Sequence, residues 1–171
     1  ETGQIIMVTF DNMGFQSQNV GHARITGVDA VLTGKGNIAS IPAVIMLGYV
    51  YTNPVDLTYD DNDTTRSTDS RILKYRYYHT FKGDMQLEYK KLSVGVSYVY
   101  HSHMINVDDV FLKPLSGNVY ILPGYKEYRE INNQGEGVWD LRMAYQMTDH
   151  SKFSFIIKNL MNNEYMTRPG D

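Results

Sequence analysis

The chain has 171 residues, with 16 lysines and arginines against 19 aspartates and glutamates. This length suffices for one domain with a sizeable core, and the charge balance lacks the basic excess that nucleic-acid binding needs, so we expect no nucleic-acid partner. Mean hydropathy is −0.37, and no apolar run is long enough for a spanning helix, which excludes a helical membrane protein.

The aromatic residues are dominated by tyrosine, with 14 Tyr against 6 Phe and 1 Trp. Tyrosine tolerates a surface that is apolar on one side and hydrated on the other, so this bias favours strands that meet an interface. Cysteine is absent. Its absence excludes disulfides, thiolate metal sites and thiol nucleophiles, and is compatible with an oxidising compartment.

The first predicted strand surrounds Gly27, where the apolar side chains change phase. Ala23 and Ile25 lie on one phase, and Val28 and Leu32 lie on the other. A bulge at Gly27 would restore a continuous apolar face. Alternatively, the glycine leaves space for a bulky cross-strand neighbour.

Period-two alternation continues along the chain and predicts strands with two different faces. It is clearest over residues 77–89 and recurs over 93–101 and 138–147, whereas residues 41–51 and 152–160 are strand-like with less clearly divided faces. We count about seven strands in all. Strands of about ten residues are long for a soluble sheet and close to the length that crosses a bilayer at a tilt.

The two phases of these strands predict two environments. Aromatic residues stand near the ends of the apolar phase, as in the aromatic girdle of a membrane barrel: Tyr77 and Tyr89, Trp139 and Tyr145, Tyr49 and Tyr51. The residues predicted to face lipid are Phe81, Met85, Leu87, Val94, Val96, Tyr98, Trp139, Leu141, Met143 and Tyr145. The residues predicted to face a polar lumen, where cross-strand ion pairs can form, are Lys82, Asp84, Glu88, Asp140 and Arg142.

Short and long connections alternate between the strands. The predicted tight turns are residues 34–37, 90–91 and 148–151, and the long loops are residues 52–72 and 105–137. Outer-membrane barrels have short turns at one rim and long loops at the other. We therefore expect a transmembrane antiparallel β-barrel whose long loops face outside. Two alternatives stay open: a small self-closing outer-membrane barrel, acting as an enzyme or adhesin, and a soluble β-sandwich that binds a ligand.

Candidate ligand contacts lie in the long loops, because aromatic and cationic side chains suit sugars and chelates: Tyr59, Arg66, Tyr120, Tyr125, Tyr128 and Arg129. His101 and His103 share a strand face but lack a third metal ligand. The acidic residues of the first loop lack the spacing of a calcium site: Asp56, Asp60, Asp61, Asp63 and Asp69. We predict no metal site and no cofactor, and since no catalytic motif is present, no enzyme activity.

Four segments, in the same order along the chain, resemble segments of TonB-dependent outer-membrane receptors, in particular those of Bacteroidetes-type bacteria. Residues 19–29 match their N-x-G-x-x-R-I-x-G strand, and residues 73–82 resemble the strand with an R-P-x-H motif, with Tyr77 in place of the proline. Residues 123–142 follow their long loop and next strand. Residues 158–170 resemble the N-L-hydrophobic-N-x-x-Y…R-P-G segment before the last strand.

The resemblance implies a 22-stranded barrel in the Gram-negative outer membrane that takes up iron chelates, cobalamin or oligosaccharides. Its implied partners are membrane lipid, a plug domain inside the lumen, periplasmic TonB acting through that plug, and a surface lipoprotein that delivers ligand. At about ten residues per strand, such a barrel needs more than this chain. We therefore expect residues 1–171 to be a C-terminal segment of the barrel wall, without the plug and the last strand.

Overall fold

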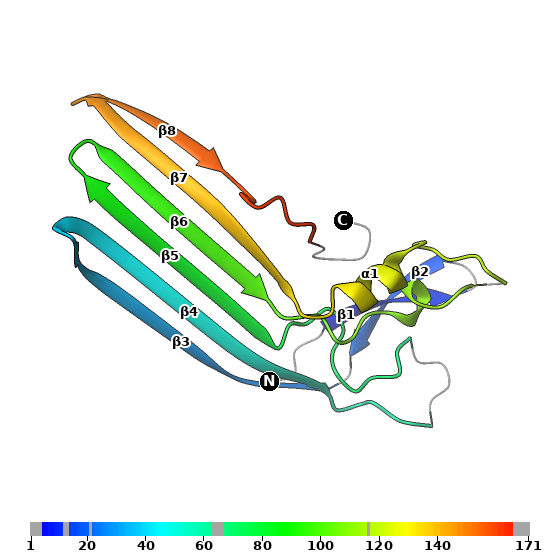
Figure 1. The fold of residues 1–171 in the computed structure, drawn as a ribbon. Helices are drawn as coiled ribbons and strands as arrows, with labels where there is room; N and C mark the ends of the chain where they lie inside the picture. Colours follow the sequence, from blue (N-terminus) through cyan, green and yellow to red (C-terminus); the bar gives the residue numbers. More distant parts are fainter. Residues whose placement is uncertain (1–4, 12–13, 21, 63–66, 116, 166–171) are drawn as a thin grey trace.

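The chain folds into antiparallel β-structure, with one broad sheet and one separate hairpin (Figure 1). The computed structural model describes residues 5–11, 14–20, 22–62, 67–115 and 117–165. The six-stranded sheet has its strands in chain order, from β3 to β8, and β1 pairs with β2. The elements are β1 (Ile5–Asp11), β2 (Gly14–Val20), β3 (Ala23–Ile38), β4 (Ile41–Asp56), β5 (His79–Tyr89), β6 (Leu92–His101), η1 (Asp109–Phe111), α1 (Tyr125–Ile131), β7 (Glu136–Thr148) and β8 (Ser151–Ile157).

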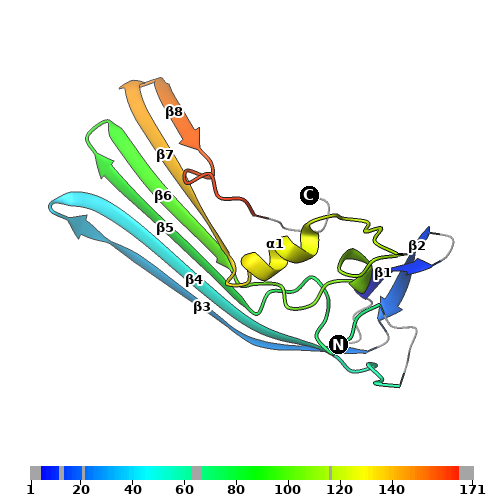
Figure 2. The ribbon, with the colours of Figure 1, turned by 45° about the vertical axis from the view of Figure 1, so that its right-hand side comes forward.

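The predicted all-β antiparallel class is confirmed, with eight strands in the described part of the chain. The large sheet is not closed, since its edge strands β3 and β8 each pair on one side among the described residues. All strands of this sheet lie side by side in one layer, and α1 and the long loops gather at one end (Figure 2). No helix in the described ranges is long and apolar enough to cross a membrane.

Two of the three predicted tight turns are confirmed, and the first is wrong. The chain turns after Tyr89, where Lys90 has a φ of 52°, and again between Thr148 and Ser151. Residues 34–37 instead belong to β3, and the turn falls on Ala39 and Ser40, whose φ values are 48° and 68°. Glycine is the usual signal for such left-handed positions, but here alanine and serine occupy them.

Gly27 does not mark a bulge. The pairing of β3 with β4 runs without a shift from Ala23 opposite Asp56 to Ile38 opposite Ile41. A Cβ atom on Gly27 would lie 2.1 Å from the carbonyl oxygen of Tyr51. The glycine is therefore required by a close approach of backbone to backbone, rather than by a bulky neighbouring side chain.

The register places each predicted set of wall residues on one face of the sheet. Directly paired residues share a face. Met85 pairs with Val96, and Val96 with Leu141, while Asp84 pairs with Ser97 and Ser97 with Asp140. We call the face that carries Met85 the apolar face and the face that carries Asp84 the polar face. The other residues predicted for lipid or lumen follow the same two phases along β5, β6 and β7.

Tyr77 is the exception in the predicted pattern. The ladder of β5 begins at His79, so Tyr77 precedes the strand. Its ring stacks at 4.4 Å on the ring of His101, which shares the polar face through its pairing with Thr80. The assignment of Tyr77 to the apolar face is therefore wrong, because the ladder that imposes the alternation has not yet begun.

The buried core lies mostly among the loops, and its part on the sheet is formed by Ala43 and Pro54 of β4. The loops between β4 and β5 and between β6 and β7 contribute the buried apolar side chains Leu73, Met104, Val107 and Tyr125. Large apolar side chains on the strands remain exposed, including Leu32 at 66% and Trp139 at 41%. A sheet of a soluble sandwich would bury one of its faces against a second layer.

The observed turn at Ala39 and Ser40 predicts a difference between two valine substitutions. Ser40→Val should destabilise the protein by about 1–2 kcal/mol, since a β-branched residue is forced into the left-handed region. Gly36→Val should be neutral or stabilising, because a Cβ atom there meets no atom within 4 Å and valine suits a strand. Urea unfolding midpoints of the two variants measure this. A lower midpoint for Gly36→Val than for Ser40→Val would contradict the observed turn and favour a turn at residues 34–37.

Candidate functional site

One end of the apolar face carries a cluster of aromatic rings. The Oη atom of Tyr49 lies 2.8 Å from Nδ1 of His79, and the rings of Tyr51 and His79 are 5.2 Å apart. Further along the same face, at the level of Gly83 and four residues in from His79, the rings of Tyr98 and Trp139 are 4.4 Å apart. We call Tyr49, Tyr51 and His79 the loop-end belt, which lies next to the start of β5.

A second set of aromatic residues marks the turn end of the same face. Tyr89 pairs with Leu92, Leu92 with Tyr145, and Tyr145 with Phe153. At about 3.3 Å per residue, β5 runs roughly 33 Å from His79 to Tyr89, which a strand tilt of about 40° reduces to roughly 25 Å along a membrane normal. This separation matches the apolar band of about 25 Å that crosses an outer membrane.

On the polar face, an ion pair crosses the sheet. Arg142 on β7 donates through Nη2 to Oδ2 of Asp84 on β5 at 2.6 Å, so its side chain passes over the intervening strand β6. A Cβ atom on Gly95 would lie 2.9 Å from that guanidinium, so glycine leaves the room that the crossing needs. The pair is half exposed, which limits its contribution to stability to about 1 kcal/mol.

The other residues predicted to face the lumen make local contacts or none among the described residues. Asp140 accepts a hydrogen bond of 2.8 Å from the backbone of Asn159, and Glu88 accepts one of 3.0 Å from Gln86. Lys82 has no ion-pair partner within the described ranges. The cross-strand pairing expected for this face is therefore formed by Arg142 with Asp84.

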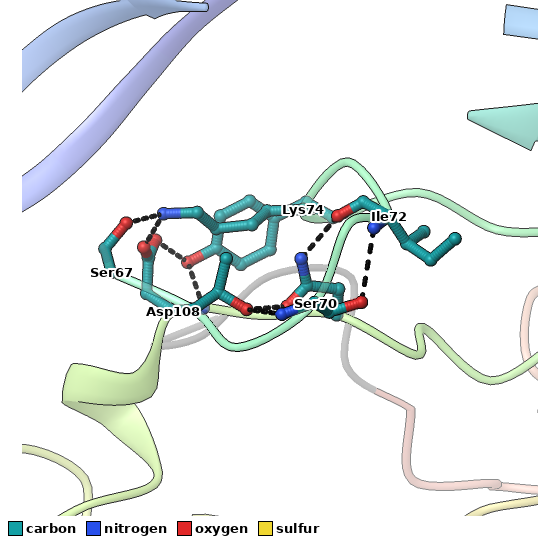
Figure 3. A network of polar contacts seen from close by, with 8 residues as sticks. Ser67, Ser70, Ile72, Lys74 and Asp108 are labelled. Carbon is teal, nitrogen blue, oxygen red and sulfur yellow. Dashed lines mark hydrogen bonds and ion pairs between the residues drawn. The ribbon is translucent and has the colours of Figure 1, made fainter. Parts of the chain in front are cut away.

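A buried ion pair joins the two long loops (Figure 3). Nζ of Lys74 donates to the carboxylate of Asp108 and to Oγ of Ser67, the latter at 2.5 Å. Oη of Tyr75 donates to the other carboxylate oxygen at 2.5 Å. Burial and the neighbouring carboxylate raise the pKa of Tyr75, so its hydroxyl stays protonated. All donors converge on one buried carboxylate, which compensates for its loss of water.

Asn106 adds a second bridge between the same loops. Its Nδ2 donates to the carbonyl of Ile72 at 2.5 Å, and its Oδ1 accepts from the hydroxyl of Thr68. Its side chain is buried, as is the adjacent Val107. Because both loops contribute polar groups to one buried network, they form a single packed layer at the end of the sheet.

A cavity lies between α1 and the end of the polar face. Tyr128 on α1 donates to Oε1 of Glu136 at the start of β7, at 2.8 Å. Arg129 donates to the carbonyl of Met104, and His103 donates to the carbonyl of Asn132 at 3.1 Å. The residues lining this cavity are Tyr77, His101, Ser102, His103, Met104, Tyr125, Tyr128, Arg129, Asn132, Gly135 and Glu136.

The electrostatics of this cavity keep its main groups in defined protonation states. Burial, together with the Glu136 carboxylate, raises the pKa of Tyr128 to about 12. Burial and the Arg129 guanidinium lower the pKa of His103. At neutral pH the cavity therefore holds a protonated phenol that donates to the Glu136 carboxylate, a neutral imidazole at His103 and the Arg129 cation. The cavity has a volume of about 20 Å³, room for about one water molecule, so these groups can hydrogen-bond a water or one small polar group of a ligand there.

The predicted ligand contacts divide between several places. Tyr128 and Arg129 line the cavity, and Tyr125 lies there too but is buried, with 5% exposure. Tyr59 lies in the other loop, where its hydroxyl donates to the carbonyl of Asp69 at 3.1 Å, and Tyr120 is exposed. Arg66 and Asp63 lie outside the described residues.

Tyr77, His101 and Glu136 line the cavity although the sequence does not predict them there. His101 and Glu136 are brought together by the pairing of β6 with β7, and Tyr77, just before β5, joins them by stacking on His101. His101 and His103 both line this cavity, but the prediction that they share a strand face is wrong, because β6 ends at His101 and His103 follows it in the loop. Nevertheless, no three His, Asp or Glu side chains in the described ranges are placed to hold a metal ion.

Comparison with known protein families finds a match over most of the chain. A family model described as TonB dependent receptor-like, beta-barrel matches residues 2–160. The match spans the hairpin, the six-stranded sheet and both long loops. The two belts, the polar face and the loop cavity therefore all lie within the matched region.

The buried loop network predicts a large effect of removing one charge. Lys74→Met leaves the Asp108 carboxylate buried without its cation and should cost about 3–5 kcal/mol of local stability. Hydrogen exchange and limited proteolysis of residues 57–78 and 102–135 measure this, and both loops should become exposed together. Lys113→Met is the matched control. Lys113 also joins the two loops, through Asp109 at 2.6 Å and Asp69 at 3.1 Å, but it is exposed, so its loss should change stability little. Opening of one loop alone would contradict the network.

Proposed function

This chain belongs to the TonB-dependent receptor family through the β-barrel domain of that family, and from this premise we propose that it forms barrel wall and external binding loops of an active-transport receptor. The family consists of outer-membrane transport receptors of Gram-negative bacteria, and it implies a TonB partner and a plug domain. The receptor takes up a scarce ligand, such as an iron chelate, cobalamin or an oligosaccharide. TonB supplies the energy by pulling on the plug.

The separation of the two aromatic belts is the observation that carries this proposal. A face with apolar side chains between two belts roughly 25 Å apart fits lipid. Phe81, Leu141 and Met143 therefore face the bilayer in our proposal, and Lys82 and Arg142 face the lumen. A soluble sandwich would cover this face with a second layer, whereas its large apolar side chains are exposed among the described residues, which disfavours that alternative.

The placement of α1 supports the same orientation. Its residue Tyr128 bonds to Glu136, which lies on the polar face, so the long loop folds over the lumen side of the wall. The loop end then faces outside, and the turns at Lys90 and Asp149 face the periplasm. Tyr128 and Arg129, with the exposed Tyr120, are the ligand contacts that we propose.

The two edge strands of the sheet, β3 and β8, indicate how the barrel is completed. Unpaired backbone groups of an edge strand cannot be satisfied by lipid, at a cost of several kcal/mol per group. We propose that further strands pair with β3 and β8, and that residues 1–171 are a C-terminal segment of a 22-stranded wall of Bacteroidetes type. A surface lipoprotein that delivers ligand is the further partner in this proposal.

A lysine on the apolar face should block insertion. Leu141→Lys or Met143→Lys should each cost about 2–4 kcal/mol in the bilayer, whereas Arg142→Gln should cost less. The folded fraction of the intact receptor in outer membranes measures this by heat-modifiable mobility on gels. Equal effects at the three adjacent positions would contradict the assignment of the two faces.

Uptake through this receptor should depend on TonB and on the loop cavity. Cells that express the intact receptor should accumulate one of three labelled probes, a ferric chelate, cobalamin or an oligosaccharide, and deletion of TonB should abolish accumulation. Arg129→Ala should reduce accumulation, because it removes the cation of the cavity. Lys126→Ala on the exposed side of α1 is the matched control. Accumulation that persists without TonB would exclude this mechanism.

A further inference from the structure

Strand β4 differs from its neighbours because it carries apolar side chains on both faces. Ile45 and Leu47 lie on the apolar face, as their pairing with Met85 and Gly83 requires. Val44, Met46 and Val50 occupy the alternate positions and lie on the polar face. Val44 is 40% exposed and Met46 is 51% exposed, so among the described residues a large part of each stays open to solvent.

These side chains form part of a continuous apolar strip, which we call the β4 strip, defined by Val31, Val44, Met46, Gly48 and Val50. Val31 on β3 pairs with Gly48 and is 68% exposed. A Cβ atom on Gly48 would have no neighbour closer than 4.0 Å. A side chain from a partner therefore has room to reach the backbone in the middle of the strip.

Charged side chains border the β4 strip on both sides. Lys35 pairs with Val44, and Lys82 pairs with Gly48. Neither lysine has a carboxylate partner in the part of the chain that the structure describes, whereas Arg142 is already paired with Asp84. Asp29 lies opposite Val50 at the loop end. A complementary surface would carry apolar side chains flanked mainly by carboxylates.

Exposure of the β4 strip to water is unfavourable, because its side chains are apolar. An exposed, contiguous apolar patch on an otherwise polar surface marks an interaction site. On β5, β6 and β7, the same face carries Lys82, Asp84, Ser97, Asp140 and Arg142, which are well solvated by water, together with the apolar residues Val99, Val138 and Ala144. At the level of Met46, the polar face is thus apolar on β4 and hydrophilic on the next three strands, where Asp84, Ser97 and Asp140 follow one another across the sheet.

We propose that the β4 strip is the docking surface for a segment of the same receptor that fills the lumen, the plug, and that β5–β7 face a hydrated gap beside it. The inference rests on the proposed function, which places the polar face inside the barrel. Met46 pairs with Asp84, well between the two aromatic belts, so the strip lies deep in the wall. The described contacts of the long loops are at the strand ends, around His101 and Glu136. An occupant of the lumen is therefore the partner that reaches the strip.

The spin-label experiment separates protein, water and lipid at three positions. The chain has no cysteine, so Met46→Cys, Leu47→Cys and Ser97→Cys each add one labelling site to the intact receptor in bilayer vesicles. A nitroxide at each site is probed with oxygen, which concentrates in lipid, and with a water-soluble nickel chelate. We expect high oxygen accessibility at position 47 and high nickel accessibility at position 97. At position 46, both should be several-fold lower.

The three positions distinguish failure of this inference from failure of the proposed function. Nickel accessibility at position 46 equal to that at position 97, with position 47 in lipid, would overturn only the docking of a segment on β4. Low oxygen accessibility at position 47 would overturn the assignment of the faces itself. The two labels at positions 46 and 47 differ by one residue, so each is the matched control of the other.

A photo-crosslinker at position 46 identifies the occupant. Benzophenone in place of Met46 should crosslink within the receptor itself, to a plug peptide that contains Asp or Glu, and mass spectrometry reads the site. The same group in place of Ser97 should give several-fold less of this product. Crosslinks to lipid, to a separate protein or to a long loop would each overturn the proposal.

Discussion

The antiparallel register of the six-stranded sheet is the constraint on which the other features depend. Each strand pairs with the next through its backbone, and the pairing fixes which side chains share a face. A slip of one residue between β5 and β6 would move Val96 beside Asp84 and bring Ser97 to the apolar face. The belts, the crossing of Arg142 over Gly95 and the cavity at Glu136 all require the observed pairing.

The faces of β5, β6 and β7 could be predicted from the sequence, because period-two alternation is a local property. The turn at Ala39 could not be, since glycines at positions 34 and 36 give a stronger turn signal than the alanine and serine that occupy the left-handed positions. Gly27 similarly reads as a phase change, although the backbone approach of Tyr51 requires it. In β4, apolar residues on both phases hide the alternation itself.

The loop layer was the least predictable part of the structure. Lys74 and Asp108 are separated by 34 positions in the sequence, and neither belongs to a motif that would predict a buried ion pair. Tyr128 and Arg129 are predicted as ligand contacts from residue type alone, and the structure does place them in a cavity. Tyr77, His101 and Glu136 join them because strand ends meet in space, which residue type cannot reveal.

The buried pair of Lys74 and Asp108 also has a mechanical consequence. A displacement of residues 57–78 must carry residues 102–135 with it, since separating them would expose an unpaired charge to an apolar layer. The two long loops therefore rearrange together or not at all, and neither loop moves by itself. The rate of this rearrangement is then set by one activation barrier that both loops share, rather than by a separate barrier for each loop.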